Sequence, residues 1–83
     1  MTDKEILEII KSGKKLSETF LNYLVNSSYV VDEKIIAQDE PYTDLVTIIK
    51  IGSKYIEIEW MKSENEEENE FLYQPYFVKT PQK

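Results

Sequence analysis

The order of apolar and polar residues predicts two helices in the first third of the chain. Apolar residues recur at helical spacing over residues 6–10, and Thr2 and Glu5 before them have the spacing of a capping box. Gly13 is a typical residue at a helix end. We therefore expect the first helix over roughly residues 3–12.

A second helix is predicted directly after the first. Ser17 is a favourable N-cap residue, and Leu16 and Leu21 occupy the two positions of a hydrophobic staple around it. The apolar stripe continues to about Asn26. One longer helix interrupted at Gly13 is the less favoured alternative.

From residue 29 onward the pattern changes to that of β-strands. β-Branched residues cluster at 29–31 and 35–37, with a charged segment at 32–34 between them. They predict either one bulged strand or two short strands. Residues 39–42, which contain Pro41, predict a turn.

The clearest local signal is a β-hairpin. Gly52-Ser53 separates residues 44–51 from 54–61, and a two-residue loop with glycine first suits a type II′ turn. This turn predicts an apolar face directed at the helices and a mixed face directed at solvent or a partner. The predicted apolar pairs are Leu45–Trp60, Thr47–Ile58 and Ile49–Ile56, and the mixed pairs are Val46–Glu59, Ile48–Glu57 and Lys50–Tyr55.

The C-terminal third predicts a polar loop over residues 63–70 and a third apolar run over residues 71–78. Pro75 lacks an N–H group, so this run is expected to be a bent or edge strand. Strand alternation would place Phe71, Tyr73 and Phe77 on one face and Leu72, Tyr76 and Val78 on the other.

Together these elements predict one α+β domain over residues 1–83. Two N-terminal helices in residues 1–27 would pack on a three- to four-stranded antiparallel sheet in residues 28–79, followed by a tail at 80–83.

The composition removes most catalytic chemistry. The chain has no histidine, cysteine or arginine, so the usual general base, thiol nucleophile, zinc ligands and bidentate phosphate clamp are missing. We therefore expect no enzyme activity, no cofactor and no metal. Acid–base work by Glu57 and Glu59 is disfavoured, because so small a chain offers little to separate their pKa values.

The net charge of −6 comes entirely from residues 32–83, because the acids and lysines of residues 1–31 cancel. Such a surface disfavours direct binding of nucleic acid or an anionic membrane and favours a basic protein partner. No signal peptide or bilayer-spanning apolar run is visible, so a cytoplasmic protein is expected.

The acidic segment supplies most of the candidate partner-binding residues, namely Glu57, Glu59, Glu64, Glu66, Glu67, Glu68 and Glu70. Tyr73 and Tyr76 complete the set as aromatic anchors. The alternative is an ordinary solvated loop. A calcium loop starting at Ser63 is disfavoured, since its central glycine and terminal bidentate acid are absent. Both faces of the run at 71–78 are apolar, which also allows a homodimer there.

The C-terminal third resembles a known group of proteins through EIEW (residues 57–60), ENEF (68–71) and QPY (74–76) followed by Phe77 and Val78. The similarity is to the C-terminal part of short uncharacterised proteins from phages and prophages of low-GC Gram-positive bacteria. It spans about a third of the chain and implies a phage accessory gene, expressed in the host cytoplasm. Many such genes encode small acidic inhibitors, including anti-CRISPR proteins, anti-restriction proteins and uracil-DNA glycosylase inhibitors.

The combined expectation is a phage-encoded acidic protein that inhibits a basic, nucleic-acid-binding host protein, for example a nuclease, by imitating nucleic acid. The alternative is a phage structural, assembly or accessory protein that oligomerises through its sheet.

Overall fold

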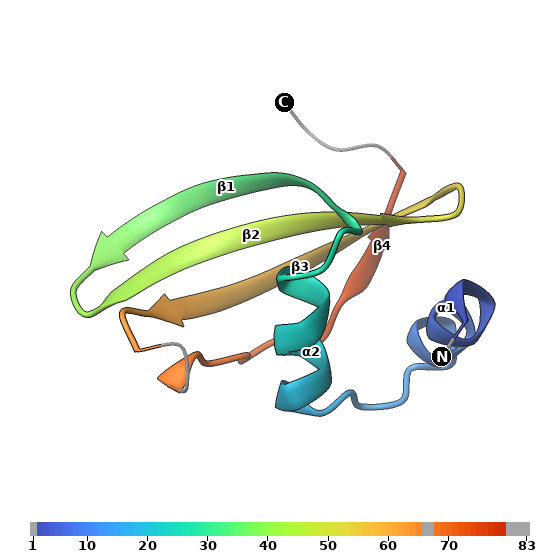
Figure 1. Ribbon diagram of the computed structural model, residues 1–83, viewed down its shortest axis with the longest axis horizontal. Coiled ribbons are helices and arrows are strands. Elements are labelled where there is room, and N and C mark those ends of the chain that lie inside the picture. Colours follow the sequence, from blue (N-terminus) through green and yellow to red (C-terminus); the bar gives the residue numbers. More distant parts are fainter. Residues whose placement is uncertain (1, 66–67, 80–83) are drawn as a thin grey trace.

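Two helices and a four-stranded antiparallel sheet form the molecule, seen in a computed structural model that describes residues 2–65 and 68–79. Both helices lie on the same side of the sheet (Figure 1). The predicted α+β class, with N-terminal helices and an antiparallel sheet, is confirmed. The elements in chain order are α1 (Asp3–Ser12), α2 (Glu18–Val25), β1 (Val30–Asp39), β2 (Tyr42–Ile51), β3 (Lys54–Ser63) and β4 (Tyr76–Val78), and the sheet has the order β1-β2-β3-β4.

The helix ends are fixed by local chemistry, as predicted. Thr2 and Glu5 form the capping box, with the Thr2 N–H donating to the Glu5 carboxylate at 3.2 Å. Gly13 ends α1 in the left-handed conformation, with φ 77°. The Ser17 hydroxyl caps α2 by accepting from the backbone N–H of Phe20 at 3.2 Å. The two-helix interpretation is therefore correct.

The strand pairing follows the predicted hairpin. Ile51 lies opposite Lys54, and all the predicted pairs out to Leu45–Trp60 are present. Gly52 has φ 62°, and no described non-glycine residue has positive φ, which fits a type II′ turn and excludes type I′. β1 is one bulged strand, because its pairing with β2 shifts register after Val30 and after Ile35.

The core lies between the helices and one face of β2 and β3. Trp60 is part of it, as predicted: its ring stacks on Phe71 with centroids 5.3 Å apart, and its Nε1 donates to the Thr47 hydroxyl at 2.8 Å. The buried core residues are Ile6, Leu16, Leu21, Leu24, Val25, Leu45, Ile49, Ile51, Ile56, Ile58, Trp60 and Phe71.

The expectation of a strand over residues 71–78 is wrong for its first half. Within residues 71–78, only Tyr76–Val78 pairs with β3. Phe71 is buried while Tyr73 is largely exposed, so the predicted alternation of faces fails there. The Gln74 side chain accepts from the backbone N–H of Leu16 at 2.8 Å. This bond ties the segment to the linker between α1 and α2, and Pro75 has no N–H to donate to a ladder.

Candidate functional site

One side of the sheet packs against the two described helices. We call the opposite side, which neither of these helices covers, the open face. Strand register places five acidic residues on it against two lysines, Lys34 and Lys50. Three tyrosines also belong to it, namely Tyr42, Tyr55 and Tyr76. The acids of the open face are Asp32, Asp39, Asp44, Glu57 and Glu59.

Glu57 and Glu59, both predicted as partner-binding, lie on this open face. They are half-buried, because β3 is flanked by β2 on one side and by β4 near Glu57 on the other. Residues two apart on a strand point to the same side about 6.6–6.8 Å from each other. Asp44 extends the acids onto β2, two positions from the partner of Glu59.

Tyr76 is held against this acidic group, as its register partner is Glu57. The Tyr76 hydroxyl donates a hydrogen bond to the Glu57 carboxylate. That bond, with smaller contributions from desolvation and from the charges of Glu57 and Glu59, raises the pKa of Tyr76 to about 12. The phenol therefore stays neutral at physiological pH and orients one carboxylate of the open face.

The open face is not uniformly polar. Ile48 is only 5 % exposed although no helix lies over it, which differs from the expected solvent contact along this face. It occupies the second strand of four, and its register neighbours Asp32 and Glu57 flank it on both sides. At the end nearest the β2–β3 turn, the Lys50 ammonium lies 5.5 Å from the ring centroid of Tyr55.

The acidic segment after β3 does not form one surface with Glu57 and Glu59. Glu70 is paired with Met61, which places it beside the open face. Glu64 lines a pocket with Leu45 and Lys62, on the side of the sheet that carries the helices. Glu68 is exposed in a single turn between these two positions, and the predicted Glu66 and Glu67 lie outside the described residues.

Asn69, in the middle of the acidic run, has a role that the sequence interpretation missed. Its side chain is buried, accepts from the backbone N–H of Ser63 at 2.9 Å and donates to Asn22 on α2 at 3.0 Å. Because both the oxygen and the nitrogen of this buried side-chain amide are hydrogen-bonded, Asn69 links the end of β3 to α2. We call this pair of bonds the Asn69 clamp. The polar loop expected over residues 63–70 is therefore anchored by buried side chains at Ser63 and Asn69. No local sequence pattern distinguishes this asparagine from its polar neighbours.

Tyr73, the other predicted anchor, lies at the border of the open face. It lines a small hollow of about 10 Å³ together with Asp44, Glu59, Met61 and Leu72. Leu72 and Tyr73 are both largely exposed. The structure thus gathers Glu57, Glu59, Glu70, Tyr73 and Tyr76 around one surface, and it adds Asp44, which the sequence interpretation had not selected.

The described residues form neither a metal site nor a membrane-spanning helix. Among residues 2–65 and 68–79, no three acidic side chains come close enough to hold a metal ion. The helices that the structure describes are too short to cross a bilayer.

Comparison with known proteins gives no relative: the chain matches no family model, no curated protein and no solved structure.

Proposed function

We propose that this chain acts by binding a basic protein through its open face, as a small phage-encoded inhibitor of a host protein that normally binds nucleic acid. The observation that carries the proposal is the excess of five acids over two lysines on a sheet face that neither described helix covers.

The geometry of the acids supports a partner whose surface is built to receive phosphates. Glu57 and Glu59 repeat along one strand, and Asp44 lies on the neighbouring strand about 4.8 Å away in the pairing direction. Closely spaced, ordered carboxylates present negative charge in rows, as a nucleic-acid backbone does. Charge complementarity of this kind speeds encounter with a positively charged groove and excludes acidic partners.

The tyrosines add apolar contact area that the charged residues do not provide. Tyr55 and Tyr76 flank Glu57 on the open face, and Tyr73 lies at its border. Tyrosine is enriched among residues that dominate binding energy, since its ring buries a large area with few rotatable bonds. An acidic centre bordered by tyrosines is a suitable composition for an inhibitory interface.

The test is quantitative capture from a Gram-positive host lysate with Asp44→Asn, Glu57→Gln and Glu59→Gln combined in one variant. We expect wild type to retain a basic protein at low salt, to release it at high salt, and the variant to retain at least about tenfold less. Gln at position 57 keeps an acceptor for Tyr76, so the fold is maintained.

A matched control removes three acids elsewhere, by Glu8→Gln, Glu40→Gln and Glu64→Gln, all exposed and none on the open face. It should retain the captured protein as wild type does. Equal loss in both variants would show that only total charge matters, and capture that resists both salt and substitution would contradict the proposal.

Self-association is a second candidate, favoured by four large exposed side chains close together in sequence: Leu72, Tyr73, Tyr76 and Phe77. It rests on the short strand β4 with no further strand paired beyond it. In light scattering, this candidate predicts a dimer that survives high salt and dissociates on Tyr76→Asp. A monomer at high concentration would contradict it.

A further inference from the structure

A pocket rich in lysine lies between α1 and the end of the sheet at the β2–β3 turn. Its volume is about 470 Å³, and its lining comes from α1, the β2–β3 turn, the start of β3, and β4 with the residue after it. Three lysines line it, Lys11, Lys54 and Lys79, and none of the described residues that line it is acidic. In a chain with sixteen acids and ten lysines, this is a local reversal of charge.

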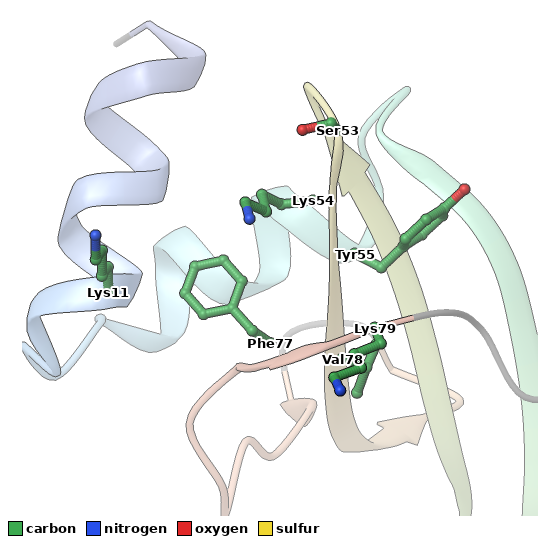
Figure 2. Close-up of a pocket in the computed structure, with 7 residues that line it drawn as sticks. All are labelled: Lys11, Ser53, Lys54, Tyr55, Phe77, Val78 and Lys79. Carbon is green, nitrogen blue, oxygen red and sulfur yellow. The ribbon is translucent and has the colours of Figure 1, made fainter.

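Lys11, Lys54 and Phe77 reach into the same space. Figure 2 shows the Lys11 side chain entering from α1 and the Lys54 side chain from the start of β3, with the Phe77 ring between them. Lys54 and Phe77 share the helix-facing side of the sheet, since their register partners Ile51 and Ile56 are both core residues. Tyr55 also lines the pocket, although its register places it on the open face and its ring points away from Lys11 in Figure 2.

The aromatic ring in this pocket is available to a ligand. Phe77 is 40 % exposed, although its register partner Ile56 is fully buried in the core. An exposed aromatic face stacks well on a planar ring, and base–aromatic stacking tolerates any base. Val78 adds apolar lining beside it.

The lysines of the pocket indicate that the ligand also carries an anionic group. Lysine ammonium groups act as point charges toward phosphate and do not need the bidentate geometry of arginine. A phosphate group has three acceptor oxygens and nearly two negative charges, so a phosphorylated ligand complements the positive charge of Lys11 and Lys54. A volume of about 470 Å³ is within the usual range of small-molecule sites.

We propose that this lysine pocket binds a small phosphorylated compound with a planar ring, of the nucleotide class. The phosphates contact Lys11 and Lys54 while the ring stacks on Phe77. This site shares Tyr55 with the open face but contains none of its acids, and the proposal does not depend on the function proposed for that face.

The test is an NMR titration of the full chain with ADP, with adenosine and inorganic pyrophosphate as its two halves. We expect saturable ADP binding that shifts the amide resonances of residues 53–55 and 77–79, and weaker binding of each half. Lys11→Gln and Lys54→Gln should each weaken ADP binding at least about fivefold, the effect of losing one charged contact.

Two further variants separate the parts of the site. Phe77→Leu should weaken ADP binding and leave pyrophosphate binding unchanged. The matched control is Lys62→Gln, which removes the same charge from a lysine that lines a different pocket, and it should bind ADP as wild type does. The proposal is overturned if ADP binding does not saturate, if Lys62→Gln weakens it as much as Lys54→Gln, or if pyrophosphate binds as tightly as ADP.

Discussion

The hydrogen bond between Tyr76 and Glu57 on the open face can be detected by titration, because it changes the pKa of the Tyr76 phenol. It holds a neutral phenol against a carboxylate and raises the pKa of Tyr76 to about 12 from an ordinary value of 10. The folded state therefore favours the protonated phenol more than the unfolded state does.

Because the pKa of Tyr76 is higher in the folded state than in the unfolded state, the bond adds to the free energy of unfolding. This stabilisation is complete below pH 10 and is lost as the pH rises from about 10 to about 12. Because Tyr76 is 47 % exposed, we expect about 1 kcal/mol, after allowance for screening by water. Among the six tyrosines, phenolate absorbance should show Tyr76 titrating late, with Tyr29, whose bond to Asp3 also raises its pKa, shifted in the same direction. Tyr76→Phe should lack the late step at about 12, and its persistence in that variant would contradict the assignment.

Asn69 gives a prediction about stability. Removing its side chain leaves the Ser63 N–H unpaired in a buried position and breaks the link to Asn22. We expect Asn69→Ala to lower the free energy of unfolding in urea by about 2 kcal/mol. Gln38→Ala, at an exposed position, should change it by less than about 0.5 kcal/mol. Equal effects would mean that the clamp contributes nothing.

At the scale of elements, β1 is a long edge strand that is protected against pairing with other chains. None of the other described strands pairs with its outer edge, and the large aliphatic side chains of Val31, Ile35 and Ile36 are more than half exposed. Two register shifts bend the strand, and charged residues 32–34 lie between them. Bulges and charges are the usual means of blocking edge-to-edge association.

Removing the charges should therefore make this edge associate. We expect Asp32→Thr with Lys34→Thr, which leaves the net charge at −6, to form oligomers that light scattering detects at concentrations where wild type forms fewer. Glu40→Thr with Lys14→Thr changes the same two charges at exposed sites outside the strands and should behave as wild type. Unchanged scattering in the β1 variant would contradict this role of the charges.

The elements that the sequence predicted correctly are those whose causes are local. Thr2 and Glu5 are three residues apart, and the Gly52-Ser53 turn fixes the pairing of the residues on either side of it. The strand expected over residues 71–78 failed because the partner of Gln74 is Leu16, 58 positions away. Contacts at that separation leave no periodic signal in the chain.

At the scale of the whole molecule, two surfaces of opposite charge occupy one small protein, with a radius of gyration of 12.4 Å. Lys54 and Phe77 face the helix side of the sheet, whereas Glu57 and Glu59 face the opposite side. We therefore expect the open face and the lysine pocket to bind their ligands independently.

This independence can be measured with the variants already described. The Asp44→Asn, Glu57→Gln and Glu59→Gln variant should bind ADP within about twofold of wild type, since none of these acids lines the pocket and water screens exposed charges. Lys11→Gln with Lys54→Gln should leave capture of the basic protein unchanged. Loss of both activities in either variant would show that the two surfaces are coupled.

The sequence by itself determined the helices, the hairpin register, the apolar face that forms the core and the acidic excess of the second half. Each depends on residues within a few positions of one another or on composition. Only the tertiary structure decided which acids share a surface. It placed Glu64 and Glu70 on different sides of the sheet and joined Asp44 to Glu57 and Glu59. It also brought Lys11, Lys54 and Lys79 to one pocket, because packing of α1 beside the hairpin depends on contacts between residues far apart in the chain.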